Sequence, residues 1–300
     1  MRHGIHHPVK GPYETHPLTI RALRRERHML ANWLARLNEF GIWRRTVPFH
    51  GFRFSPPTLD RWVALQAHRF GLMGKGEFLF FDKLIERDWR VADVGANQGL
   101  YTLYFSRQSP EGRIYAFEPD PRLFAALKEN IQQNRAENVV LFNAAAADRI
   151  AKLTLRAGRF NRGDNRIVPS HTASPGTVEV DAMPLDDAIP ERRVDLLKID
   201  VQGFEVQVLR GAQRLLQANP DLVILLEFWP HGLRIADSAP EELLQILAKA
   251  GFSIYRQTSI EATEPFIYRA NEWSRASQFC NLVATRQTNF WQKLAAKRVA

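Results

Sequence analysis

Short apolar runs alternate along this chain with longer segments in which apolar residues recur every three or four positions. The short runs have the length of buried strands, and the longer segments have the period of amphipathic helices. The runs predict strands over residues 91–94, 113–117, 138–142, 152–156, 177–180, 194–199, 222–226, 252–255 and 279–285. The longer segments predict helices over residues 77–86, 100–107, 121–135, 203–216 and 240–250.

Strands that alternate with helices indicate an α/β fold, because parallel strands are usually joined by a crossover helix. We therefore predict a doubly wound, mostly parallel, Rossmann-like sheet that binds its ligand at the carboxyl ends of its strands. A polar stretch over residues 158–176 interrupts the alternation and contains Asn165 and His171. We expect this stretch to close over a substrate.

The first 76 residues have a different pattern, which predicts a basic, partly disordered and helical N-terminal extension. Residues 1–17 are rich in His, Pro and Gly and indicate a disordered lead. Helical periods predict helices over residues 18–40 and 58–70, the first with arginines outside its apolar face. Such a basic helix can lie on a membrane surface. Packing on its own domain or on a second subunit is favoured, so a homo-oligomer is one expectation.

A strand, a glycine turn and a helix follow one another directly over residues 90–107. The strand ends at Asp93, and the turn runs from Gly95 through Asn97 to Gly99. Such a turn directs backbone N–H groups and a positive helix end at one ligand, and we expect its glycines to allow close approach. The next strand ends in Glu118, at the distance where an acid meets the ribose hydroxyls of a nucleoside.

The residue types in this turn distinguish between nucleoside cofactors. Dinucleotide sites use G-x-G-x-x-G, whereas this chain has Asp93-x-Gly95-x-Asn97-x-Gly99, with a carboxylate that would repel a pyrophosphate. An acid at this strand end suits a cationic ligand. S-adenosylmethionine has a sulfonium, an ammonium, a ribose diol and no phosphate, and is the cofactor that we predict.

The positive charge of the chain is concentrated at its ends. The 300 residues carry a formal net charge of +9, with +6 in residues 1–60 and +4 in residues 286–300. We interpret residues 287–300 as a basic C-terminal tail, and both ends can contact anionic lipid, nucleic acid or an acidic glycan. The single cysteine excludes an internal disulfide, and no apolar run has the length of a membrane span or a signal. We expect a cytoplasmic protein, with peripheral contact at the inner membrane surface through the basic helix.

Several sequence blocks resemble the signature of the FkbM-type methyltransferases. In chain order they are DVGANQG at 93–99, FEP at 117–119, LDD at 185–187, LLKIDVQGFE at 196–205, VLRGA at 208–212 and LEFWP at 226–230. The resemblance covers roughly residues 77–286, which we interpret as the methyltransferase domain. It implies a class I S-adenosylmethionine-dependent fold with an antiparallel last strand. It also implies O-methylation, commonly of sugar hydroxyls on glycans, glycolipids or natural products.

Carried over by position, the resemblance implies cofactor-binding residues. The 93–99 turn holds the methionine part, Glu118 holds the ribose, and Asp148 lies near the adenine. One position departs from the family, which usually has an acid where this chain has Gln202. If that acid serves a metal or a proton transfer, this chain must do so otherwise. If it only caps the following helix, glutamine is a mild change.

Four residues are candidates for the methyl-transfer step. Asp200 and Glu227 follow neighbouring predicted strands, so we expect the acceptor hydroxyl to lie over both. His231 can act as a base when neutral, or be an ordinary loop residue. Lys198 shares a strand face with Asp200 and can oppose a rise in carboxylate pKa, or form a structural ion pair. Mg²⁺ is compatible with two carboxylates, but the signal is weak and no metal ligands are assigned.

Three functions agree with these features. The favoured one is methyl transfer to a small-molecule, glycan or glycolipid acceptor. The basic ends also permit a nucleic-acid methyltransferase, but the core has no basic stripe with interleaved aromatic residues, so no nucleic-acid partner is expected. A non-catalytic adenosyl-binding scaffold is the third interpretation, because an intact turn indicates binding and does not establish turnover.

Overall fold

The computed structural model describes residues 47–49, 52–55, 75–158, 165–172, 174–257 and 265–297. The chain divides into two compact units, Met1–Arg44 and Arg45–Ala300, and every described residue belongs to the second. The predicted disordered lead and the helices predicted over residues 18–40 and 58–70 lie outside the described residues.

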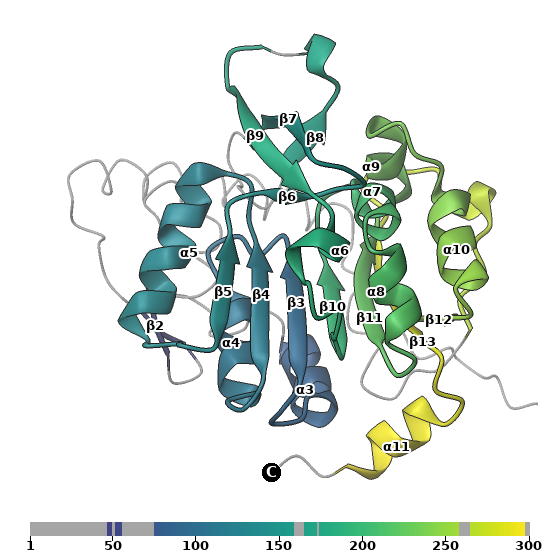
Figure 1. Ribbon diagram of the computed structural model, residues 1–300. Coiled ribbons are helices and arrows are strands. Elements are labelled where there is room, and N and C mark those ends of the chain that lie inside the picture. The colour runs from purple at the N-terminus through teal and green to yellow at the C-terminus, as the bar shows by residue number, and fades with distance from the viewer. Residues whose placement is uncertain are drawn as a thin grey trace, which may run out of the picture. The chain divides into compact units, whose positions relative to one another are not determined.

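A seven-stranded sheet forms the centre of the second unit (Figure 1). In spatial order its strands are β12 (Ser253–Arg256), β13 (Cys280–Thr285), β11 (Val223–Phe228), β10 (Leu196–Ile199), β3 (Arg90–Val94), β4 (Arg113–Phe117) and β5 (Val139–Phe142). The strands from β11 to β5 pair in parallel, whereas β13 is antiparallel to both β11 and β12. The predicted α/β class, with a mostly parallel sheet and an antiparallel last strand, is confirmed.

Successive residues of a strand point to opposite faces of the sheet. Both faces of this sheet carry apolar residues, and helices cover both. In β3, Val91 belongs to one buried cluster, whereas Ala92 and Val94 belong to the other. The first cluster includes residues of α3 (Lys75–Leu84), α4 (Leu100–Gln108), α5 (Pro121–Gln133) and α11 (Phe290–Ala296). The second includes residues of α6 (Leu185–Ala188), α7 (Glu205–Arg210), α8 (Gln213–Ala218), α9 (Pro230–Ile235) and α10 (Pro240–Lys249).

A second, four-stranded sheet lies above the carboxyl ends of the central strands (Figure 1). Its order is β6 (Ala145–Ala146), β9 (Thr177–Met183), β7 (Ala151–Arg156) and β8 (Arg166–Val168). The strand β8 lies inside the stretch that the sequence predicted as a polar loop. Because this sheet stands over the edge where ligands bind in such folds, it is placed to form one wall of a site.

The helix predicted over residues 203–216 is two helices, α7 and α8, with a break at Gly211. The Asp186 carboxylate accepts hydrogen bonds from the Arg214 and Leu215 amides, at 2.9 and 2.7 Å, and so starts a new helix. Gly211 packs against the main chain directly after β6, where a Cβ would lie 1.8 Å from the Ala147 carbonyl oxygen. The break therefore comes from tertiary contacts and not from the local pattern.

Two elements near the ends of the chain also join the core. In the segment predicted as a basic tail, α11 buries Phe290 and Leu294. In the predicted N-terminal extension, β1 (Val47–Phe49) and β2 (Phe52–Phe54) form a hairpin, and Phe54 is fully buried. Both elements contribute to the cluster that contains α3 and α5.

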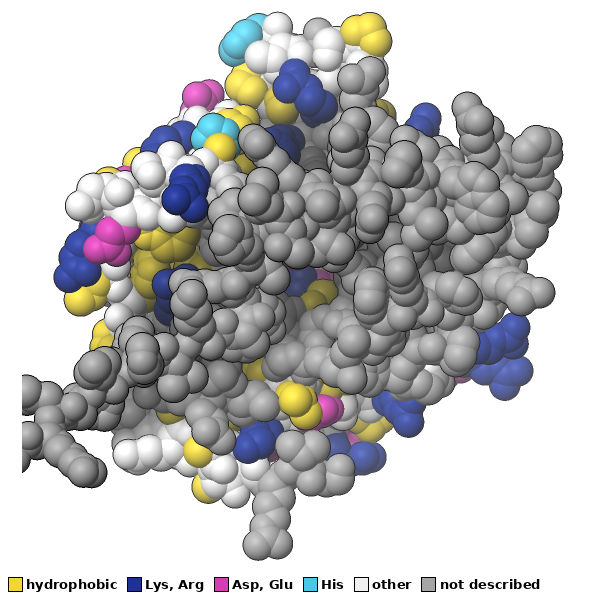
Figure 2. All heavy atoms as spheres, turned by 180° about the vertical axis from the view of Figure 1, so that it is seen from behind, with side chains coloured by type: hydrophobic (Ala, Val, Ile, Leu, Met, Phe, Trp, Pro, Cys, Tyr) yellow, Lys and Arg dark blue, Asp and Glu magenta, His cyan; other side chains and the backbone are white. Residues whose placement is uncertain are grey.

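Two surface properties bear on possible partners. Among the described residues, no helix combines the length and the apolar character that a membrane crossing requires. On the face shown in Figure 2, the lysines and arginines of the described residues are interspersed with acidic and apolar side chains.

Candidate functional site

The turn after β3 is held by main-chain hydrogen bonds at the carboxyl edge of the sheet. The Gly95 and Ala96 amides both donate to the Phe117 carbonyl oxygen, at 3.0 and 2.9 Å. Asn97 and Gly99 adopt left-handed φ values of 54° and 88°. A non-glycine residue with positive φ is uncommon and persists only where its surroundings fix it. The turn predicted from the sequence is therefore present as a tightly constrained loop.

Both predicted glycines of the turn are surrounded by protein atoms. A Cβ on Gly95 would lie 2.0 Å from the Asp200 carbonyl oxygen, and a Cβ on Gly99 would lie 2.5 Å from Leu127 Cδ1. The direction in which a Cβ would point is thus filled by protein atoms at both glycines, and Gly95 also lines the pocket described below. The close packing at Gly95 has a second effect, since it brings the turn directly against the segment that carries Asp200.

Glu118 at the end of β4 is buried and faces the turn. Its Oε2 accepts a hydrogen bond from the Asn97 amide and its Oε1 accepts one from the Asp120 amide, both at 2.8 Å. Burial raises the pKa of Glu118 to about 8, against the opposing effect of these two amides. The carboxylate predicted for ribose binding is therefore fixed in orientation by main-chain donors.

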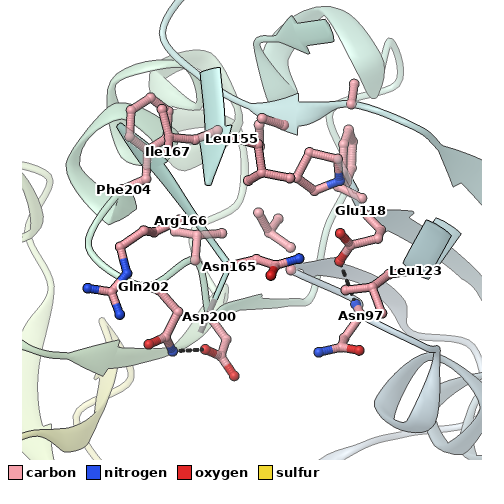
Figure 3. A pocket seen from close by; sticks show the side chains of 18 residues that line it. Asn97, Glu118, Leu123, Leu155, Asn165, Arg166, Ile167, Asp200, Gln202 and Phe204 are labelled. Carbon is pink, nitrogen blue, oxygen red and sulfur yellow. Dashed lines mark hydrogen bonds between the residues drawn. The ribbon is translucent and has the colours of Figure 1, made fainter. Parts of the chain in front are cut away.

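A pocket with about 540 Å³ of empty space, part of which is open to solvent, lies between the turn and the small sheet (Figure 3). One side is formed by the turn and Glu118, and the other by Leu155, Asn165, Arg166 and Ile167 of the small sheet and its loop. Asp200, Gln202 and Phe204 line the pocket between them. Three elements that are distant in sequence thus converge on one cavity.

The wall formed by the small sheet is tied to its surroundings by two polar residues. Asn165 Nδ2 donates to Asp120 Oδ2 at 2.9 Å, and the Gly158 amide donates to Asn165 Oδ1 at 2.8 Å. The Arg166 guanidinium carbon lies 5.0 Å from the centre of the Trp229 ring, in a cation–π arrangement. The sequence analysis expected Asn165 to lie near the substrate but did not identify Arg166. In the sequence Arg166 is only one basic residue within a polar stretch.

Asp93 and Lys198 form a buried ion pair beneath the turn. Asp93 is fully buried, Thr102 Oγ1 donates to its Oδ2 at 2.7 Å, and Lys198 Nζ lies 3.6 Å from its Oδ1. Burial raises the pKa of Asp93, and Lys198 opposes the rise. Neither residue is among the described residues that line the pocket. The sequence analysis assigned the Asp93 carboxylate to a cationic cofactor, and in the structure this carboxylate pairs with Lys198.

Gln202 joins the two carboxylates that the sequence identified at the ends of β10 and β11. Its Nε2 donates to Asp200 Oδ1 at 3.0 Å and to Glu227 Oε2 at 2.8 Å. Gln202 has a left-handed φ of 54°, which is a strained conformation for a residue with a side chain. On the other side, Lys198 Nζ lies 3.6 Å from Asp200 Oδ2. The Asp200 carboxylate is thus held between an amide and an ammonium.

The two carboxylates differ in their access to the pocket. The Asp200 side chain is 43% exposed and lines the cavity, whereas Glu227 is not one of the described lining residues. Burial, followed by the charges of Asp200 and Glu205, raises the pKa of Glu227 to about 9. This shift favours the neutral form of Glu227. The placement of the two acids does not support the expectation that an acceptor hydroxyl lies over both.

Glu205 is a third buried acid that the sequence analysis did not identify. Its Oε1 accepts a hydrogen bond from the Gly203 amide at 3.1 Å, and burial raises its pKa to about 7. Glu205 is the last residue of the LLKIDVQGFE block. In the sequence it is indistinguishable from an ordinary acid in the first turn of a helix.

Three other predicted residues lie apart from the cavity. His231 is exposed at the start of α9, with its ring centre 5.8 Å from that of Trp229. Asp148 pairs with Arg149 at 3.2 Å, and His171 is exposed in a 3₁₀ turn. None of the three belongs to the described lining of the pocket. The proximity of Asp148 to an adenine, implied by the resemblance, has no support in this placement.

The residues around the turn fit S-adenosylmethionine. Asn97 Oδ1 is buried at the pocket and has no hydrogen-bond partner among the described residues, so it can accept a bond from a ligand. The Glu118 carboxylate is of the type that binds a ribose diol. For a metal ion, the described residues contain no group of three or more His, Cys, Asp or Glu in a suitable arrangement.

Comparison with known proteins agrees with this geometry. The family model described as the methyltransferase FkbM domain matches residues 93–254. The match begins at the acid before the glycine turn and ends in β12, and so includes Glu118, Asp200, Gln202 and Glu227.

Three relatives illustrate the range of similar proteins. Methyltransferase sdnD of Sordaria araneosa is 29% identical over 211 residues, covering 59% of this chain and 78% of the relative. The 2-O-methyltransferase NoeI of Sinorhizobium fredii is 27% identical over 143 residues, covering 42% of this chain and 58% of the relative. The hexuronic acid methyltransferase AglP of Haloferax volcanii is 26% identical over 196 residues, with coverages of 61% and 70%. The chain thus spans little more than half the length of NoeI.

Proposed function

The chain belongs to the methyltransferase FkbM domain family, and on that premise we propose that it transfers the methyl group of S-adenosylmethionine to a hydroxyl of a sugar, a glycolipid or a natural product. The observation that carries the proposal is the Asp200 carboxylate, which lines the same pocket as the cofactor turn. An attacking hydroxyl needs a proton acceptor within reach, and this carboxylate supplies one. The name of NoeI, a 2-O-methyltransferase, supports transfer to oxygen, and the name of AglP, a hexuronic acid methyltransferase, supports an acceptor of sugar type.

Asn97 and Glu118 would hold the cofactor, which supplies an electrophilic methyl group when bound. Glu118 accepts hydrogen bonds from the ribose hydroxyls, while the Asn97 and Asp120 amides keep its carboxylate oriented. Asn97 Oδ1 accepts a hydrogen bond from a donor of the cofactor. These contacts fix the methyl donor relative to Asp200, because the turn packs on the Asp200 main chain at Gly95.

Asp200 Oδ2 would accept the proton of the acceptor hydroxyl, and the hydroxyl oxygen would take the methyl group that the bound cofactor supplies, leaving S-adenosylhomocysteine. Asp200 Oδ1 stays hydrogen-bonded to Gln202, which keeps the carboxylate in one orientation. Lys198 Nζ lies 3.6 Å from Asp200 Oδ2 and holds this oxygen from the other side. In this proposal Glu227 is a positioning residue, because it lies outside the described pocket lining and acts through Gln202. His231 takes no proton.

We also propose that this pair of acids works without a divalent cation. A bridging metal ion would bind the oxygens that face each other, and here the Gln202 amide donates to those oxygens of Asp200 and Glu227. Activity on the true acceptor should therefore be unchanged by a chelator. A loss of activity that added Mg²⁺ restores would contradict this part of the proposal.

The experiment for the proposed function uses methyl-labelled cofactor with fractionated glycan and metabolite extracts. Labelled product is identified by NMR, and we expect the label on an oxygen of a hydroxyl-bearing acceptor. Label on nitrogen, on carbon or in nucleic acid would contradict the assignment. Asp181→Asn is the matched control, because this exposed acid pairs with Lys152 on the small sheet and should leave the transfer rate unchanged.

A further inference from the structure

The hairpin β1–β2 lies outside the matched residues 93–254 but is joined to α5 by two asparagines one helical turn apart. Asn134 Oδ1 accepts a hydrogen bond from the Arg53 amide at 2.9 Å, and its Nδ2 donates to the Arg53 carbonyl at 2.8 Å. Asn130 Oδ1 accepts from the Ser55 amide at 2.8 Å, and its Nδ2 donates to the Ser55 carbonyl at 3.2 Å. Each carboxamide thus accepts the N–H and donates to the C=O of one residue, which is the pairing that a residue in a neighbouring strand provides.

Asn130 continues this chain of contacts to the cofactor turn. Its Nδ2 also donates to the Gln98 carbonyl oxygen at 2.9 Å, and the Asn130 side chain is fully buried. The Nδ2 of Asn134 donates instead to the Asn130 carbonyl of its own helix. Two residues that bind the same hairpin in the same way therefore differ in whether they reach the turn.

Gln98 lies between the two left-handed residues of the turn, Asn97 and Gly99. Such a conformation is stable only when its surroundings determine it on several sides. Glu118 holds one side, since its carboxylate accepts the Asn97 amide. Asn130 holds the other, because its Nδ2 donates to the Gln98 carbonyl oxygen.

We propose that Asn130 is a positioning residue for S-adenosylmethionine, and that Ser55 holds it in place, so that the hairpin at residues 47–55 takes part in cofactor binding. The proposal concerns the turn alone and does not depend on the acceptor or on the role of Asp200. It assigns a cofactor-linked role to a hairpin that precedes the methyltransferase domain predicted from the sequence.

The test uses the full chain and calorimetric titration with S-adenosylhomocysteine, the demethylated product. Asn130→Ala should lower the affinity about tenfold, the loss expected for one hydrogen bond of about 1.4 kcal/mol. Asn134→Ala loosens the same hairpin without touching Gln98, so it should lower the unfolding temperature but leave the affinity within about twofold. Wild-type affinity in a folded Asn130→Ala variant would overturn the proposal, as would equal losses of affinity in both variants.

Asn130→Asp separates the two halves of the proposal and serves if the alanine variant does not fold. The carboxylate can still accept the Ser55 amide but can donate neither to Gln98 nor to the Ser55 carbonyl. Affinity should therefore fall, while the Ser55 amide and Asn134 keep the hairpin attached. Hydrogen exchange gives the reciprocal readout, since binding at one site must affect the other by the same coupling. Adding S-adenosylhomocysteine should slow exchange of the Ser55 amide in the wild type and not in Asn130→Asp. An unchanged exchange rate in the wild type would contradict the link to the hairpin.

Discussion

Glu118, which is buried, and Glu227, which is partly buried, lie on the same edge of the sheet and are held in different ways. Burial raises the pKa of both, to about 8 and about 9. Glu118 accepts two main-chain amides and lines the pocket, whereas Glu227 accepts the Gln202 side chain behind it. A hydrogen bond from a main-chain amide persists when the residue that carries the amide is substituted, whereas a hydrogen bond from a side chain is lost. We call the turn and Glu118 the cofactor side, and Asp200, Gln202 and Glu227 the acceptor side, after their proposed roles. The orientation of the acid is set by the main chain on the cofactor side and by a side chain on the acceptor side.

The largest expected effect is that of Asp200→Asn on the acceptor side. Asparagine keeps the shape of the side chain and loses the proton acceptor, so turnover should fall by roughly 10²–10⁴-fold. Calorimetry with S-adenosylhomocysteine should show cofactor affinity within about twofold of the wild type, because the contact at Gly95 uses the Asp200 main chain. Normal turnover on a true acceptor would exclude Asp200 as the base.

Matched Glu→Gln substitutions should separate the two sides directly. Glu118→Gln places an amide against donor N–H groups and removes the charge that receives the ribose hydroxyls, so affinity for S-adenosylhomocysteine should fall by about 1.5–3 kcal/mol, roughly 10–100-fold. Glu227→Gln should leave this affinity within about twofold, because Glu227 lies outside the described pocket lining. Similar losses in both variants, measured by calorimetry, would remove the distinction between the sides.

Gln202→Glu should sharpen the account of the acceptor side. The substitution removes the donor to both acids and adds a third carboxylate between them, so turnover should fall by roughly tenfold, the effect of about 1.4 kcal/mol on a barrier. Mg²⁺ should restore part of this loss, since three carboxylates suit a hard cation, while the wild type should not respond. Rates are measured with and without chelator. If the variant has the turnover of the wild type without metal, the Gln202 bridge between Asp200 and Glu227 has no role in the transfer.

The smallest effect is expected for His231→Ala. This exposed residue stands at the start of α9 next to Trp229, apart from the described lining of the pocket. Its removal should change turnover by less than about threefold, as surface substitutions usually cost within 0.5 kcal/mol. A hundredfold loss, together with a missing limb in the pH–rate profile, would instead identify His231 as the base.

The sequence predicted the strand, the turn and the helix around residues 90–107 because their signals are local. The spacing of Gly95, Gly99 and Glu118 follows from a strand, a turn and a helix in direct succession, and the parallel sheet follows from alternating elements. The burial of Asp93 was not predictable from the same motif, since its partners Thr102 and Lys198 approach from a helix and from a neighbouring strand.

Long-range contacts limited the predictions elsewhere. The break between α7 and α8 depends on Asp186, which lies 28 residues before Arg214. The bridge from Gln202 to Glu227 spans 25 residues, and the bond between Ser55 and Asn130 spans 75. No periodicity within one segment reports such pairs. Sequence alone therefore identified the acids of the acceptor side but not the residue that orients them.

The most direct test of the account is the pH dependence of S-adenosylhomocysteine binding to the wild type and to Glu118→Gln. The pKa of Glu118 is about 8 in the free protein, and ribose hydroxyls donate to the ionised form, so binding must release a proton below that pH. Wild-type affinity should rise by up to about tenfold per pH unit from pH 6 and level off above pH 8, while Glu118→Gln stays flat. A flat wild-type profile, or the same slope in the variant, would contradict the assignment of Glu118 to the cofactor.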